Sequence, residues 1–151
     1  MDITAERIDD FFARYAGSLT AFDADAAAAL WSTPGLVVDD NASIVAASRE
    51  EMAAGVRASY PLYKQLGLAS VDRELLDVTR VTERLAFAHV RFVFRDADGA
   101  RLTDTTSHYL LRDEDGELRA TVCIETDAAE TSARSPPRRA WSCRTRDPGM
   151  G

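Results

Sequence analysis

The N-terminal part of the chain carries apolar residues at the spacing of a helix. Starting near Thr4, six of them recur every three or four positions and share one stripe: Ile8, Phe11, Phe12, Tyr15, Leu19 and Phe22. Residues of these types usually pack in a core. Tyr15 differs from the others, because a buried tyrosine hydroxyl needs a hydrogen-bond partner.

A second, short helix is predicted through the alanine run 26–29. Asp23 or Asp25 can accept hydrogen bonds from its first backbone N–H groups, and Pro34 prevents the helix from continuing. Residues 36–45 then predict a small hairpin, because β-branched residues flank a turn-forming Asp-Asp-Asn sequence.

A third helix is predicted from a capping box. Ser48 can accept from the backbone at Glu51 while the Glu51 side chain reaches back, and an apolar stripe continues to Tyr60. Alternating β-branched and aromatic residues follow, interrupted by turns rich in Asp and Gly. They predict four antiparallel strands, at residues 68–80, 84–95, 101–112 and 117–126. Helices followed by a sheet indicate an α+β fold.

Charge and cysteine content exclude several classes of protein. The formal net charge of -7 argues against nucleic acid or an anionic membrane surface as a partner. The N-terminus is acidic, unlike a signal peptide, and no apolar run approaches the ~20 residues that span a bilayer, so we expect a cytoplasmic protein. Two cysteines, Cys123 and Cys143, do not suggest a disulfide framework, and no histidine or cysteine spacing suggests a metal or cofactor.

Residues 128–151 differ from the rest of the chain in composition. Five arginines against two acidic residues give this stretch a net charge of +3, and three prolines interrupt any periodicity. We therefore expect one folded domain over residues 1–127, followed by a basic, disordered tail over residues 128–151.

The order of elements and three short motifs resemble the nuclear transport factor 2-like superfamily, which includes ketosteroid isomerases and SnoaL-like polyketide cyclases. The motifs are the pair Arg14-Tyr15 on the first helix, the Asp-x-Asp of residues 23–25, and a Val-x-Asp that ends at Asp39. The resemblance covers residues 3–126. It implies a cone-shaped curved antiparallel sheet wrapped by three N-terminal helices around one pocket, and a homodimer formed through the outer face of the sheet.

The resemblance also implies roles for single residues. Tyr15 takes the position of a tyrosine that donates to a developing enolate, and Asp39 that of an aspartate that moves a proton between carbon atoms. His108 stands where the family has a protonated aspartate, and a histidine can donate, accept or carry charge. A half-exposed strand histidine without a role is the alternative for His108. Asp39 is equally suited to stabilising a turn, and Asp40 is an alternative base.

Strand pairing about a turn at residues 113–116 predicts which side chains share a face of the sheet. One face would then carry polar or mixed residues, namely Asp104, Thr106, His108, Thr121, Cys123 and Glu125. The other face would carry Tyr109, Leu111, Leu118, Ala120, Val122 and Ile124. The polar face lines the pocket if the resemblance holds, whereas pattern alone favours the apolar face as the core.

We expect the pocket to bind a small apolar molecule. Trp31, Tyr60 and Tyr63 are candidates for an aromatic wall, and the remaining candidate binding residues are Asp40, Asp104, Cys123 and Glu125. Two functions fit. One is a cofactor-free acid/base isomerase, cyclase or dehydratase that acts on a small apolar carbonyl compound through Tyr15, Asp39 and His108. The other is a noncatalytic ligand-binding or dimerisation module.

Overall fold

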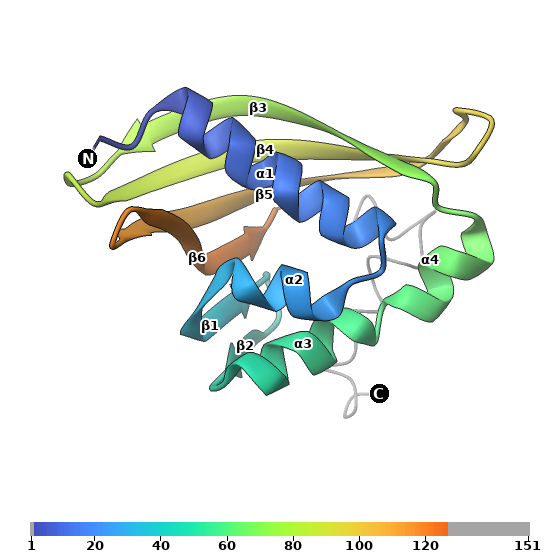
Figure 1. Ribbon diagram of the computed structural model, residues 1–151, viewed down its shortest axis with the longest axis horizontal. Helices are drawn as coiled ribbons and strands as arrows, with labels where there is room; N and C mark the ends of the chain where they lie inside the picture. The colour runs from blue at the N-terminus through green and yellow to red at the C-terminus, as the bar shows by residue number, and fades with distance from the viewer. Residues whose placement is uncertain (1, 127–151) are drawn as a thin grey trace.

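The computed structural model describes residues 2–126, so the predicted basic tail lies outside the described residues. Helices and strands follow one another in the predicted order (Figure 1). The elements are α1 (Ala5–Thr20), α2 (Ala24–Ala29), β1 (Trp31–Val38), β2 (Ser43–Ala46), α3 (Arg49–Arg57), α4 (Tyr60–Leu66), β3 (Ser70–Arg80), β4 (Leu85–Arg95), β5 (Arg101–Glu114) and β6 (Glu117–Glu125).

The predicted helix starts are confirmed by their capping hydrogen bonds. Thr4 accepts from the backbone N–H of Arg7 at the start of α1, and Asp23 accepts from Ala26 at the start of α2. Ser48 accepts from Glu51 at the start of α3 over 3.1 Å. These side chains satisfy backbone donors that have no partner within the helix, which is why the helices begin there.

The third predicted helix is divided in two. Residues 49–57 form α3, and after a break at Ala58 and Ser59 the chain starts α4 with Pro61 in its first turn. Proline has no backbone N–H to donate into the preceding turn, so it favours the start of a helix over its interior. Gly67 ends α4 with a left-handed φ of 85°.

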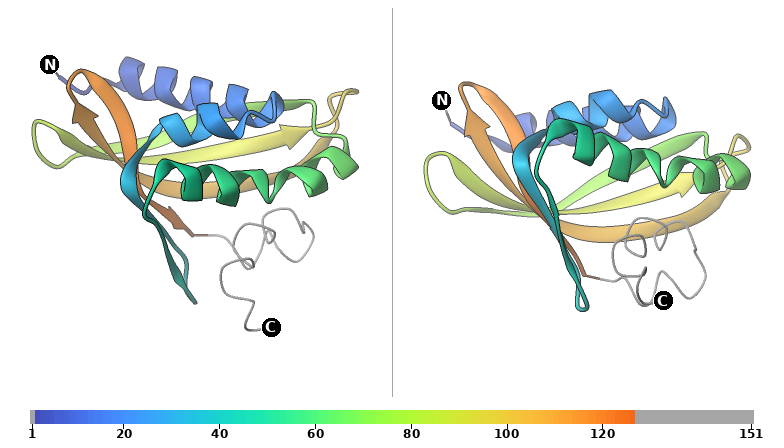
Figure 2. Two further views of the ribbon diagram at one scale, coloured as in Figure 1. Left: turned by 60° about the horizontal axis from the view of Figure 1, so that its bottom comes forward. Right: turned by 90° about the horizontal axis from the view of Figure 1, so that it is seen from below.

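Six strands form one curved sheet in the order β2-β1-β6-β5-β4-β3. All neighbours are antiparallel except β1 and β6, which run parallel. Figure 2 shows the helices on one side of the sheet. We call that side the inner face and the opposite side the outer face. The architecture is the predicted α+β cone.

The core lies between α1 and the inner face. Phe11 and Phe12 of α1 are each 1% exposed, and the ring of Phe12 meets those of Phe92 and Tyr109 edge-on at 5.9 and 5.1 Å. The helical stripe predicted from the sequence is therefore the stripe that packs on the sheet. No helix within residues 2–126 has the length and apolar character needed to cross a membrane.

A bulge in β6 determines which of its residues face inward. The hairpin turn is shorter than predicted: β5 extends to Glu114, which pairs with Glu117. The pairing then runs from Leu111 opposite Ala120 to Leu110 opposite Val122, which leaves Thr121 as an extra residue. An extra residue reverses the alternation of side chains beyond it. Cys123 and Glu125 consequently face inward together with Tyr109 and Ser107, while Val122 and Ile124 face outward.

Candidate functional site

A cavity of about 80 Å³, partly open to solvent, lies between the helices and the inner face of the sheet. An engineered cavity of about 150 Å³ in another protein binds benzene, so the space here suits the head group of a small ligand. The lining is mostly aromatic or apolar and carries a few polar groups. It consists of Tyr15, Leu19, Trp31, Val56, Ser59, Tyr63, Phe92, Phe94, Thr105, Ser107, Tyr109, Cys123 and Glu125.

Tyr15 brings a hydroxyl from α1 into this cavity. Its ring lies between those of Phe92 and Tyr109, each 6.0 Å away. Burial raises the pKa of Tyr15 well above its usual range, and the Cys123 thiol adds to the rise. The hydroxyl therefore stays neutral at physiological pH. Although deep, Tyr15 keeps accessible surface where it lines the cavity, so a ligand can reach it.

Three polar side chains of β5 and β6 line the cavity together with Tyr15, namely Ser107, Tyr109 and Cys123. Burial raises the pKa of Tyr109 and of Cys123 well above their usual ranges. The Tyr109 and Ser107 side chains next to the thiol partly offset the rise for Cys123. These groups are all protonated, so this part of the cavity offers neutral hydrogen-bond partners rather than charges.

Trp31 forms another wall of the cavity from the start of β1. It is 3% exposed, and its ring lies 6.4 Å from that of Tyr109. Its Nε1 has no hydrogen-bond partner among the described residues. The indole fits because residue 35 is glycine: a Cβ there would lie 2.8 Å from Cε3 of Trp31 and 2.9 Å from Cε of Met52.

Glu125 is the one carboxylate among the described lining residues, and none of them is Lys, Arg or His. It raises the pKa values of Cys123 and Tyr109 through its charge, which indicates that its carboxylate acts on the same space. A permanently anionic ligand would therefore lose its hydration here without meeting a positive charge, which is costly. A neutral ligand with one acceptor oxygen suits the lining better.

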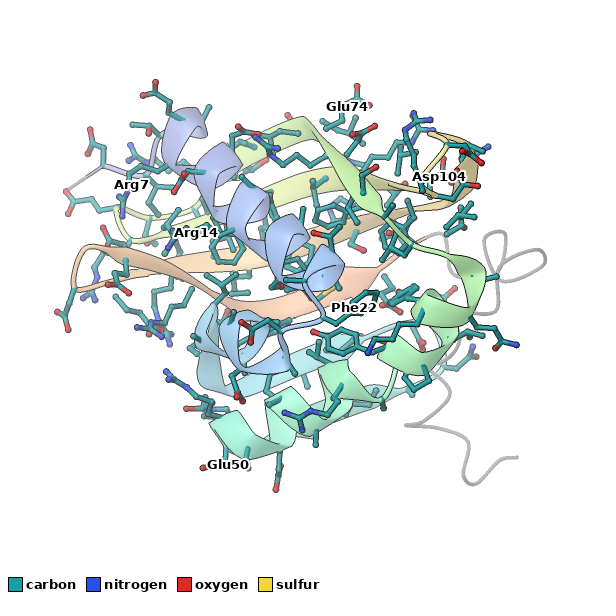
Figure 3. The ribbon with its side chains drawn as sticks, turned by 45° about the vertical axis from the view of Figure 1, so that its right-hand side comes forward. Arg7, Arg14, Phe22, Glu50, Glu74 and Asp104 are labelled. Carbon is teal, nitrogen blue, oxygen red and sulfur yellow. The ribbon has the colours of Figure 1, made fainter. Side chains whose placement is uncertain are left out.

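The structure separates His108 and Asp104 from the cavity, so the prediction that Tyr15, Asp39 and His108 converge on one cavity is wrong. Both lie on the outer face. Beyond the bulge at Thr121, Tyr109 and Ser107 of β5 pair with the inward residues of β6, so the alternate residues of β5 point outward. His108 pairs with Ile124 and stacks on His89. Asp104 is bound by Arg91 and Arg101 at 2.6 and 2.9 Å, near the β4–β5 turn (Figure 3).

The two aspartates after β1 lie in the turn that leads to β2. Oδ1 of Asp39 accepts from the backbone N–H groups of Asn41 and Ala42 at 2.8 and 2.9 Å. This is the turn-stabilising role that the sequence left open as an alternative to a catalytic one. Asp40 is exposed. Neither belongs to the described lining of the cavity.

The predicted aromatic wall is present in part. Trp31 and Tyr63 line the cavity, together with Cys123 and Glu125 from the predicted binding residues. Tyr60 does not; it is buried against Phe22, with ring centroids 5.3 Å apart. Phe22 lies at the corner after α1 (Figure 3).

Sequence reasoning missed several lining residues, above all Tyr109 and Ser107. The predicted register puts Tyr109 on the face opposite Cys123 and assigns no role to Ser107, and the bulge brings both to the side of Cys123. A weak signal was present in the strict alternation of Thr103, Thr105, Ser107 and Tyr109, which places small polar residues and a tyrosine on one face. Within residues 2–126, no three His, Cys, Asp or Glu side chains are grouped so as to hold a metal ion.

Comparison with known proteins gives a family and a fold. Residues 5–128 match the family described as NTF2-like protein (DUF6841). No curated protein matches the chain. An NTF-2 like protein of unknown function from Shewanella oneidensis MR-1 shares the fold with a TM-score of 0.67 at 12% identity, over 83% of this chain and 100% of that one.

Two further solved structures agree on the fold. An NTF2-like protein with a cystatin-like fold from Novosphingobium aromaticivorans has a TM-score of 0.62 at 21% identity, over 85% of this chain and 86% of that one. A ketosteroid isomerase-like protein from Erwinia carotovora atroseptica has a TM-score of 0.57 at 16% identity, over 80% and 93%. Likeness at these identities concerns the fold and not the chemistry.

Proposed function

Because the chain belongs to the family of NTF2-like proteins DUF6841, we propose that it binds a small, neutral, largely apolar carbonyl compound in the cavity between its helices and sheet. The observation that carries the proposal is the hydroxyl of Tyr15, which is deep, neutral and in contact with the cavity. A neutral hydroxyl in such a site donates a hydrogen bond to a carbonyl oxygen. This hydrogen bond becomes stronger as negative charge develops on that oxygen.

We further propose an acid/base reaction in which Tyr15 holds the carbonyl oxygen and Glu125 removes a proton from a neighbouring carbon. A carboxylate and a hydrogen-bond donor lining one small apolar space are the two groups that enolisation requires. The proton that leaves carbon resides on the Glu125 carboxylate and returns to another carbon, so no cofactor is needed. His108 has no part in this scheme.

A noncatalytic ligand-binding protein is the second candidate. One observation favours it: Asp39, the residue that the resemblance suggests as a base, uses its carboxylate to hold the turn after β1. Binding without turnover is the property that separates this candidate from the enzyme.

A small enone tests binding and chemistry together. Titration with 2-cyclohexen-1-one is expected to shift the absorption of the enone to longer wavelength, because a hydrogen bond to the carbonyl lowers the energy of its excited state. The matched anion 1-cyclohexene-1-carboxylate is expected not to bind. Tyr15→Phe should weaken binding about tenfold or less, the range of one neutral hydrogen bond, and abolish the shift. Equal binding of the anion would contradict the proposal.

Exchange of carbon-bound protons in D₂O, followed by proton NMR, then tests catalysis. Glu125→Gln should abolish exchange while the enone still binds, and Asp39→Asn, which keeps a turn-capping oxygen, should exchange like the wild type. Loss of exchange in Asp39→Asn alone would assign the base to Asp39. Binding without exchange in the wild type would favour the noncatalytic protein.

A further inference from the structure

One buried donor at the cavity has no acceptor. Trp31 is 3% exposed, lines the cavity, and its Nε1 has no hydrogen-bond partner among residues 2–126. Buried polar groups in folded proteins are nearly always paired, because an unpaired one loses its hydration without compensation. This N–H is therefore the wall donor that gains most from an acceptor entering the cavity.

Gly35 determines which edge of the indole faces the cavity. The Cε3 edge of Trp31 packs against this glycine so closely that a Cβ at position 35 would lie 2.8 Å from Cε3. Gly35 is not among the described residues that line the cavity, so the Cε3 edge faces away from it. In an indole, the nitrogen belongs to the opposite long edge. The N–H is therefore on the side of the ring that faces the cavity.

Trp31 and Tyr15 present their donors at separate places in the cavity wall. Tyr109 is the neighbour that they share, with its ring 6.0 Å from that of Tyr15 and 6.4 Å from that of Trp31. Within residues 2–126, the other rings in contact with Tyr15 are those of Phe11 and Phe92, and no ring contact joins Tyr15 to Trp31. Two donors placed apart in this way suit two acceptor atoms of one ligand.

We infer that the ligand carries a second acceptor oxygen, which accepts from the N–H of Trp31 while Tyr15 donates to the carbonyl oxygen. This rests on the proposed function and names its substrate class, a small neutral ketone with a further carbonyl or hydroxyl oxygen. The second oxygen is uncharged, because Glu125 lines the same cavity. The N–H is already dehydrated in the folded protein, so pairing it costs no further hydration. A site with such a donor discriminates against a ligand that lacks the matching oxygen.

The wild-type protein tests the inference without a substitution in the site. The full chain contains two tryptophans, Trp31 and Trp141, so a ¹⁵N-labelled sample gives two indole N–H resonances, and Trp141→Phe assigns them. Saturation with cyclohexane-1,4-dione should move the Trp31 N–H proton downfield, as expected when an unpaired donor gains an acceptor. Cyclohexanone, which has the same ring and one oxygen, should not. A Trp31 resonance that moves no further with the dione than with cyclohexanone would overturn the inference.

Affinities for the same two ketones separate this role from packing. By calorimetry, the wild type should bind the dione about tenfold more tightly than cyclohexanone, the range of one hydrogen bond to a buried donor. Trp31→Phe should bind both equally, whereas Tyr15→Phe should weaken both by the same factor. Gly35→Ala, which displaces the indole, should reduce the preference if Trp31→Phe does not fold.

Two results separate this inference from the proposed function. Equal affinity of the wild type for both ketones, or a preference for the dione that persists in Trp31→Phe, would overturn the inference. Binding that depends on Tyr15 would leave the proposed function standing in either case. Failure of the wild type to bind cyclohexanone, the dione and 2-cyclohexen-1-one would overturn both.

Discussion

His89 and His108 stack face to face on the outer face of the sheet, with ring centroids 4.1 Å apart and planes 9° apart. They are direct partners across β4 and β5, and Asp77 of β3 pairs with His89 on its other side. The pair lines a shallow surface cavity together with Asp77, Thr79, Phe87 and Ile124. A positive charge on His108 would lie directly against the His89 ring, so this contact disfavours protonation of His108.

This stacking predicts that acid destabilises the protein. Burial and the neighbouring His89 lower the pKa of His108, and Asp77 offsets them only in part. The unfolded chain, with an ordinary histidine pKa of about 6.5, binds more protons than the folded one below that pH, so stability falls as pH falls through this window. The urea concentration at the midpoint of unfolding should fall between about pH 7.5 and pH 5.5. In His108→Gln it should fall less over the same range. Parallel pH curves for the two proteins would contradict the prediction.

A second copy of the chain is expected to cover the outer face. Helices within residues 2–126 cover only the inner face (Figure 2), and a belt of partly exposed apolar residues crosses the outer one. The belt consists of Leu36, Val38, Phe87, Leu110, Val122 and Ile124. Ion pairs such as Arg91 with Asp104 and Arg112 with Glu114 flank it. An apolar centre with a charged rim is typical of a protein interface.

Sedimentation velocity checks this prediction. The wild-type chain should sediment as a dimer, and Leu110→Lys, which puts a charge in the belt, should sediment as a monomer. Leu66→Lys adds the same charge on α4, on the helical side of the sheet, at a residue that is 38% exposed, and should remain dimeric. A monomeric wild type, or a dimer unaffected by Leu110→Lys, would mean that the belt is not the interface.

The sequence predicts the fold well because its signals are local. The capping residues Thr4, Asp23 and Ser48 determine where helices begin, and strand alternation places the long strands close to their observed ends. The site is predicted less well because it depends on register. A single extra residue, Thr121, changes which side chains of β6 lie beside those of β5, and no local pattern marks it. His108 was therefore assigned to the cavity and Tyr109 was not.

Replacing Tyr60 with phenylalanine should stabilise the protein. Its hydroxyl is buried without a hydrogen-bond partner among residues 2–126, and burial, with a smaller contribution from Asp23, raises its pKa to about 12. Tyr60→Phe keeps the ring contact with Phe22 and removes the unpaired group, so urea unfolding should show about 1 kcal/mol more stability. Ser59→Ala is the matched control; it removes a buried hydroxyl that donates to the Val56 carbonyl at 2.8 Å and should destabilise. Equal destabilisation by both substitutions would mean that the Tyr60 hydroxyl has a partner, such as a buried water.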